Sequence, residues 1–248
     1  GQHTAAYIAT DYKDAANYAR TLLDYLPDNN AASFNLAATE DDPNRLCARL
    51  NDLAEDGYNV KDVISEIADN GKYIEMYGAF AEEMVTAFAF VDGQTVGVIA
   101  NQYCINDGRI TAAAALKGER FINLCNSYSI PVVFLADTDG FEISKQAEEN
   151  GLAPAAARFM AAVAAASVPM ITVILKRAIG GGYIAMGSLG LGADRAFAWA
   201  GAEIGLMVPA SAVCLNPDLL QNANDPINDR KEIENAYALE HMDALVAA

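Results

Sequence analysis

Apolar and polar positions follow two different patterns along the 248-residue chain, and the change falls near residue 75. Before it, apolar residues recur at spacings of three and four, which predicts short amphipathic helices. The first helix would bury one face, made of Ala15, Tyr18, Ala19, Leu22 and Leu26. Thr10 or Asp11 can cap its start, and Pro27 is expected to end it.

Two further helices are expected in this N-terminal part. Asp42 and Pro43 place a capping residue before a proline, which favours a helix start. The buried face of that helix would consist of Leu46, Leu50 and Leu53. Another helix is expected over residues 60–68. The three helices together predict a helical lead-in, residues 1–75, packed on a main domain, residues 76–248.

The main domain is expected to alternate strands with helices. Two β-rich runs flank Asp92 and Gly93, a dipeptide that favours a tight hairpin. Further strands are expected in "IPVVFLADTDG", "MITVILK" and "RAFAWAGAEIGLM", with helices over residues 111–127 and 153–166 between them. Strands joined by helices of this length pair in parallel, so the sequence predicts an α/β fold.

The composition excludes several kinds of function. The chain carries 33 acidic and 16 basic residues, a net charge of −17, so we expect no binding to nucleic acids or anionic membranes. The longest apolar stretch is interrupted by Arg158 and Pro169, which argues against a membrane span. Four cysteines without a C-x-x-C pair and two distant histidines give no metal-ligand spacing. No signal peptide is recognised, and we expect reduced thiols in a cytoplasmic protein.

Three consecutive glycines, Gly180 to Gly182, follow a β-branched run and precede a helical pattern. Glycines after a strand can simply form a tight left-handed turn. With Ala185 and Glu203 they also partly match the fingerprint of dinucleotide binding. A third interpretation is an oxyanion hole, because free N–H groups at a helix start stabilise negative charge and a Cβ beside them would block the oxygen.

A second loop of the same kind lies upstream, in "ADTDGFEIS". Gly140 and Phe141 follow a buried strand there, and loops that follow neighbouring parallel strands lie side by side. Asp137 and Asp139 form either a carboxylate pair or ordinary turn and cap residues. No histidine is placed to make a triad with Ser144.

Three stretches, "DTDGFEISKQAEENG", "VPMITVILKRAIGGGYIAM" and "AFAWAGAEIGLM", resemble the second half of the biotin-dependent acyl-CoA carboxyltransferase subunits. The resemblance extends upstream and covers about residues 19–207. It implies a crotonase-like fold, a spiral of ββα units, and the C-terminal carboxyltransferase domain of such a subunit. The implied partners are an acyl-CoA, a biotin carboxyl carrier protein, an N-terminal carboxyltransferase domain and further copies of the subunit in an oligomer.

The resemblance also implies a site. The second glycine of the family's GGA motif and the residue after it match Gly181 and Gly182, whose backbone N–H groups hold the ureido oxygen of biotin in the family. Gly180, Gly140 and Phe141 would line the same site, without a metal. Biotin would be carried by a partner protein, and its carboxyl group would pass to or from the acyl-CoA without a side-chain base.

The sequence departs from the family pattern at several positions. Asp139 stands where the family usually has proline, and a basic family stretch is replaced near residues 153–156. After Met207 the chain reads "VPASAV", where an "MGAEGAV"-like run is usual. Two alternatives therefore stay open: a non-catalytic assembly half of such a complex, and a stand-alone crotonase-like enzyme that acts on an acyl-CoA.

Overall fold

The computed structural model describes residues 5–32, 36–42, 44–47, 57–216 and 229–247, together with 50, 218 and 225. Its centre is a seven-stranded sheet in the order β1-β2-β3-β4-β5-β6, with a short seventh strand, β7, paired to β5. The strands are β1 (Tyr73–Met76), β2 (Met84–Val91), β3 (Gln94–Asn101), β4 (Val132–Thr138), β5 (Met170–Ile179), β6 (Arg195–Ala198) and β7 (Glu203–Gly205).

The sheet joins an antiparallel part to a parallel part. β1, β2 and β3 pair antiparallel, and the pairs from β3 to β6 are parallel. The turn between β2 and β3 lies at Asp92 and Gly93, with φ of 51° and 73°. This left-handed conformation is the one that an Asp-Gly hairpin favours. The predicted hairpin and the predicted parallel pairing are therefore confirmed.

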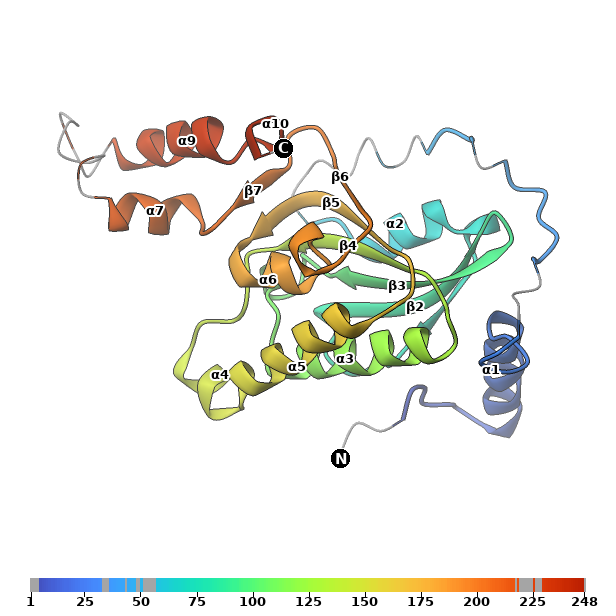
Figure 1. The fold of residues 1–248 in the computed structure, drawn as a ribbon. Coiled ribbons are helices and arrows are strands. Elements are labelled where there is room, and N and C mark those ends of the chain that lie inside the picture. Colours follow the sequence, from blue (N-terminus) through green and yellow to red (C-terminus); the bar gives the residue numbers. More distant parts are fainter. Residues whose placement is uncertain are drawn as a thin grey trace.

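Helices cover both faces of the sheet (Figure 1). One face packs against α3 (Ala112–Ser127) and α5 (Leu152–Ala165), and the other against α2 (Val60–Ile67). The remaining helices lie at the ends of the sheet or beyond it. They are α1 (Tyr12–Tyr25), α4 (Lys145–Glu149), α6 (Gly180–Ala185), α7 (Pro209–Leu215), α9 (Arg230–His241) and α10 (Ala244–Ala247), with 3-10 turns η2 (Asp69–Gly71), η3 (Asn106–Gly108) and η4 (Leu189–Leu191).

The hydrophobic core has two layers, one on each face of the sheet. Met84 and Phe88 of β2 belong to the layer under α3 and α5, whereas Val85 and Ala89 belong to the layer under α2. Successive side chains of a strand point to opposite faces of the sheet. β2 therefore contributes to both layers and is buried on both faces. Among the described residues, no helix is long and apolar enough to cross a bilayer.

The N-terminal part agrees with the sequence in two helices and differs in one. α1 and α2 form where predicted, and the residues up to 75 also include the start of β1. The predicted buried face of α1 is wrong in part, because Ala15 and Ala19 are exposed and Tyr25 is the buried residue of this helix. The helix expected from Asp42 does not begin there, because residues 44–47 lie outside regular structure and Leu46 is 91% exposed. Arg45 explains the difference, since it binds Asp41 at 2.7 Å and a carbonyl after α2. Pro43 and Leu53 lie outside the described residues.

Gly118 sets how closely α3 and α5 approach each other. A Cβ at this position would lie 2.6 Å from Cε2 of Phe159 and 3.1 Å from Sδ of Met84. We expect Gly118→Ala to lower the free energy of unfolding by about 1–2 kcal/mol, because overpacking outweighs the gain in helix propensity. Urea unfolding measures the change. Asn123→Ala, at an exposed position of the same helix, should stay within about 0.5 kcal/mol of the wild type. Equal stability of wild type and Gly118→Ala would contradict the close packing.

Candidate functional site

The glycine turn, Gly180 to Gly182, lies where β5 passes directly into α6. Gly180 has a φ of 57°, a left-handed conformation that favours glycine. Because α6 begins at Gly180, the N–H groups of these three glycines belong to the first helical turn and have no carbonyl partner inside the helix. Among the described residues, no side chain caps this end of α6. N–H groups in such a position are the kind of donor that an oxyanion hole requires.

A second backbone lies against the turn. A Cβ on Gly182 would be 2.6 Å from Cα and 2.7 Å from the carbonyl carbon of Gly140. Backbone atoms cannot rotate away as the end of a side chain can, so this contact requires glycine at position 182. A Cβ on Gly181 would instead lie 3.3 Å from the ring of Phe141. The structure thus brings together the two loops that the sequence placed after neighbouring strands.

The loop at Gly140 is held from two directions. Thr138 Oγ1 accepts a hydrogen bond from the Gly140 N–H at 3.1 Å. The Gly140 carbonyl accepts one from the Ile110 N–H at 2.9 Å, and the Ile110 carbonyl accepts one from the Glu142 N–H at 3.1 Å. Gly140 itself has a φ of 112°, which only glycine adopts without strain. These bonds fix the loop that packs on the glycine turn.

An irregularity in β5 directs the chain into the turn. Ala136 of β4 pairs with Ile174 of β5, but two residues later Thr138 pairs with Ala178, so β5 bulges by two residues. Asp137 lies opposite this bulge, and its Oδ1 accepts a hydrogen bond from the Arg177 N–H at 3.0 Å. A bulge leaves backbone groups without a strand partner, and the Asp137 carboxylate supplies one.

Asp137 is fully buried, and its second oxygen is also bonded. Oδ2 accepts a hydrogen bond from the Tyr58 hydroxyl at 2.6 Å, and the Asp137 N–H donates to Asn101 Oδ1 at 3.2 Å. Burial raises the pKa of Asp137 to about 6, although the bonds from Tyr58 and from the Arg177 N–H act in the opposite direction. Burial and the neighbouring carboxylate raise the pKa of Tyr58. The pair therefore consists of a carboxylate and a neutral phenol at neutral pH.

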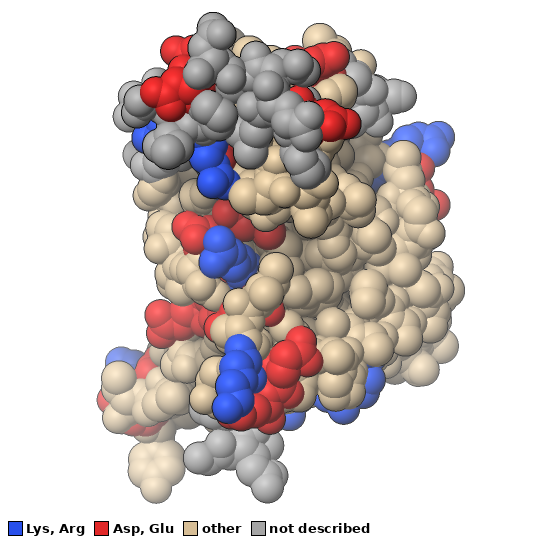
Figure 2. All heavy atoms as spheres, turned by 90° about the vertical axis from the view of Figure 1, so that its left-hand side faces the viewer, with Lys and Arg blue, Asp and Glu red and all other residues tan. Residues whose placement is uncertain are grey.

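Charged side chains surround the outer side of this region. Arg177 Nη1 lies 3.1 Å from Asp139 Oδ1 and also donates to the Tyr103 hydroxyl. Arg109 approaches the same carboxylate at 3.9 Å. Figure 2 shows the molecule from the left-hand side of Figure 1, where basic and acidic side chains lie next to one another along one side of the described surface. Asp139 thus pairs with basic side chains rather than acting as a solvated turn residue.

The geometry also bears on the other interpretations of the glycines. Glu203 lies on β7, and its carboxylate is 3.8 Å from Arg177 Nε. The acidic residue of the dinucleotide fingerprint thus lies beside an arginine in this fold, whereas the fingerprint places it on a ribose hydroxyl. The sequence analysis did not identify Tyr58 and Tyr103 as part of this region. Their partners, Asp137 and Arg177, lie far along the chain, so no sequence spacing indicates these contacts.

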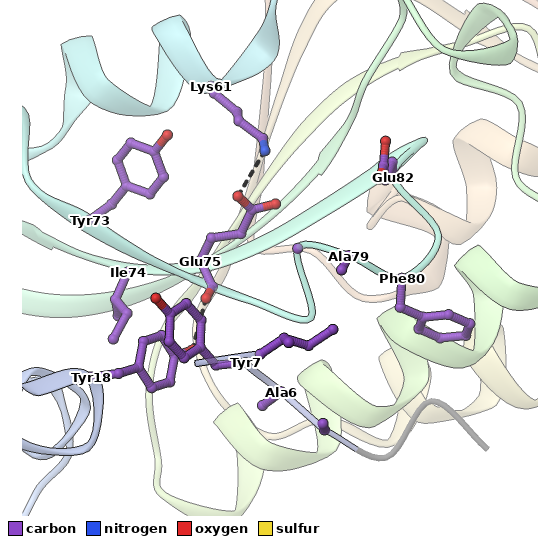
Figure 3. A pocket seen from close by; sticks show the side chains of 13 residues that line it. Ala6, Tyr7, Tyr18, Lys61, Tyr73, Ile74, Glu75, Ala79, Phe80 and Glu82 are labelled. Atoms are coloured by element: carbon purple, nitrogen blue, oxygen red, sulfur yellow. Dashed lines mark hydrogen bonds and ion pairs between the residues drawn. The ribbon is translucent and has the colours of Figure 1, made fainter. Parts of the chain in front are cut away.

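A cavity of about 760 Å³ lies elsewhere, at the β1 edge of the sheet (Figure 3). β1 is separated from β5 by β2, β3 and β4. Tyr7 and Tyr18 stack in this cavity with ring centroids 4.0 Å apart, and Lys61 binds Glu75 at 2.8 Å. This cavity therefore lies away from the glycine turn.

The buried carboxyl of Asp137 gives a testable dependence of stability on pH. Its pKa is about 6 in the folded protein against an ordinary 3.8, so the folded state holds a proton that the unfolded chain has lost. Its contribution is fully present below about pH 4 and is lost as the pH rises through about 6. Relative to Asp137→Asn, the wild type should lose up to about 3 kcal/mol between pH 4 and pH 7. Urea unfolding of both proteins across this range measures it, and parallel curves would contradict a raised pKa.

Comparisons with known proteins agree with this geometry. The model of the carboxyl transferase domain family matches residues 3–236. The chain is 37% identical over 249 residues to the carboxyltransferase subunit of propionyl-CoA carboxylase from Haloferax mediterranei, a match that covers 98% of this chain and 48% of that subunit. It is 38% identical over 242 residues to the 12S subunit of methylmalonyl-CoA carboxyltransferase from Propionibacterium freudenreichii subsp. shermanii, covering 93% and 46% of the two chains.

Solved structures give the same result. The crystal structure of transcarboxylase 12S with hydrolysed methylmalonyl-coenzyme A bound, described as a hexamer assembly, superposes with a TM-score of 0.92 at 36% identity, over 98% of this chain and 48% of that one. A single-chain long-chain acyl-CoA carboxylase superposes with a TM-score of 0.82 at 29% identity, over 99% and 24%. The fold is therefore crotonase-like, as the resemblance implied. The chain spans about half the length of the curated relatives it matches, and it belongs to the carboxyl transferase domain family.

Proposed function

We propose that this chain forms the biotin-side half of a carboxyltransferase active site, where a carboxyl group passes between carboxybiotin and an acyl-CoA. The observation that carries the proposal is the glycine turn. Gly181 and Gly182 present first-turn N–H groups, and the contact of Gly182 with Gly140 leaves no room for a side chain. Family membership supports the class of reaction. Relatives named as propionyl-CoA carboxylase and methylmalonyl-CoA carboxyltransferase point to short acyl-CoA substrates.

The residues of the turn fit the ureido group of biotin. Adjacent N–H groups can bind one oxygen, and the absence of Cβ atoms at Gly180, Gly181 and Gly182 leaves the backbone open to a planar group. Biotin supplies a ring that carries the carboxyl group and takes up negative charge when that group leaves. Gly181 and Gly182 would stabilise that charge through their N–H groups, by about 2.7–4 kcal/mol for each donor. Phe141, whose ring lies beside Gly181, would help to exclude water.

The reaction needs parts that this chain does not supply. An acyl-CoA site would come from an N-terminal carboxyltransferase domain, because the chain spans about half the length of its relatives. The biotin would be attached to a separate carrier protein rather than to this chain. An oligomer of several subunits, as described for transcarboxylase 12S, would bring the two halves of the site together.

Gly182→Val tests the proposal in the full-length protein that carries this chain. Two methyl groups at this position would push the Gly140 loop away from the turn and displace at least one donor. We expect carboxyl transfer from methylmalonyl-CoA to free biotin to fall by about 100-fold or more. The rate of formation of propionyl-CoA and carboxybiotin, followed by liquid chromatography, measures it.

Gly190→Val is the matched control, because a Cβ there would meet its nearest atom at 3.9 Å. This variant should keep the wild-type rate. Circular dichroism and the oligomeric state should be unchanged in both variants. Wild-type turnover in Gly182→Val would remove the role of the turn. A wild-type protein that neither transfers a carboxyl group nor binds a biotinylated carrier would favour the non-catalytic assembly half instead.

A further inference from the structure

Asp137 lies at the point where the sheet, the bulge and the glycine turn are connected. It is fully buried in β4, opposite the bulge of β5, and its bonding partner Arg177 lies three positions before Gly180. Its neighbour Thr138 points the other way and holds Gly140. Consecutive residues of one strand thus fix both backbones that meet at the site.

The buried carboxylate requires an explanation. Ionisation of a fully buried carboxyl costs free energy, because the charge loses its contact with water. A residue needed only to fill the space or to accept the Arg177 N–H would not need a charge. Ionised carboxylates form stronger hydrogen bonds than neutral acceptors, and Asp137 accepts two, from the Tyr58 hydroxyl at 2.6 Å and from the Arg177 N–H at 3.0 Å.

We propose that Asp137 is a positioning residue whose ionised carboxylate holds the β5 bulge and thereby aims the N–H groups of the glycine turn. The proposal rests on the carboxyltransferase function proposed above. When the carboxyl gains a proton, one of its oxygens becomes a donor and the bond to the Arg177 N–H weakens. The bulge then loosens, the turn loses its alignment with the Gly140 loop, and transfer falls on the acid side.

Groups on the elements packed against Asp137 affect its titration. They are Tyr58 before α2, and Lys176 and Arg177 of β5. Tyr103 after β3 lies close enough that the charge of Asp137 raises its pKa. Tyr58 acts most directly, because its hydroxyl donates to the carboxylate and favours the ionised form. η3 closes the site from one side, since a Cβ on Gly108 would lie 2.1 Å from the Asp137 carbonyl oxygen.

The test compares transfer from methylmalonyl-CoA to free biotin across pH in the full-length protein. The wild-type rate should fall on the acid side with a midpoint near 6, the pKa of Asp137. Asp137→Asn keeps an oxygen toward Arg177 but carries no charge. Its rate at pH 8 should be about 10- to 100-fold lower, and its acid limb should be absent. Tyr58→Phe should keep the limb and move its midpoint to higher pH, because the carboxylate has lost a donor.

Two variants serve as matched controls. Tyr103→Phe removes a hydroxyl that binds Arg177 Nη1 rather than Asp137 and that is uncharged near pH 6, because burial raises its pKa to about 12. Asp107→Asn removes an exposed carboxylate at η3. Both should leave the midpoint where it is. Asp137→Asn should also be at least as stable as the wild type at pH 8, whereas a purely structural residue would lose stability together with activity. Full activity of Asp137→Asn at pH 8, or an acid limb that neither Asp137→Asn nor Tyr58→Phe alters, would overturn the proposal.

Hydrogen exchange separates this proposal from the proposed function. After correction for the intrinsic rate, the peptide that covers residues 177–182 should exchange faster below pH 6 in the wild type and at every pH in Asp137→Asn. If the wild type transfers no carboxyl group, the function proposed above fails, and exchange alone decides whether Asp137 holds the turn. Exchange in this peptide that is independent of pH and of the Asn substitution would overturn the positioning role.

Discussion

The contact between the backbones of Gly140 and Gly182 is the constraint on which the site depends. The two residues follow β4 and β5, which are adjacent and parallel, so their loops leave the sheet at the same edge. The loops approach so closely that a single Cβ on Gly182 would lie 2.6 Å from the other backbone. This approach leaves no room for a side chain at position 182, and the ring of Phe141 lies beside Gly181. The catalysis by backbone donors proposed above would need this exclusion, because a side chain there would occupy the place of the bound oxygen.

The position of the contact is set within the sheet rather than by the loops. Thr138 and Asp137 are consecutive residues of β4, and their side chains leave opposite faces of the strand. Thr138 binds the Gly140 loop, and Asp137 binds the bulge in β5 that leads to the glycine turn. A loop fixed by its parent strand in this way loses little conformational freedom when a ligand binds, so binding energy is kept for the reaction.

Periodicity and turn chemistry were enough to predict most of the framework. The hairpin followed from Asp92 and Gly93, and the parallel strands followed from the helices between them. β1 was missed because four residues are too few to show a two-residue period. The helix expected to bury Leu46 was wrong, since local spacing gives no information about the polar anchors of Arg45.

Part of the candidate site could likewise be predicted from the sequence, and part could not. Local sequence shows a glycine-rich turn after a strand, and parallel pairing brings the loop of Gly140 to it. The bulge in β5 could not be predicted. Nor could the hydrogen bond from Tyr58 to Asp137, because it joins residues 79 positions apart. Polar contacts between distant residues leave no periodic pattern in the sequence. From the sequence Asp137 could be an ordinary turn residue, and only the folded chain shows that its carboxyl group is buried inside the sheet.

One departure from the family pattern named in the sequence analysis lies beside this contact. The resemblance implies proline at position 139, where this chain has Asp139. Proline would fix the loop through its ring, whereas Asp139 fixes it through ion pairs with Arg177 and Arg109. Arg177 belongs to β5, the strand that leads into the glycine turn, so these ion pairs join the Gly140 loop to the strand on which the turn depends. The loop is therefore held by charge instead of by a ring, and it is held against a turn that leaves no room for a Cβ at position 182.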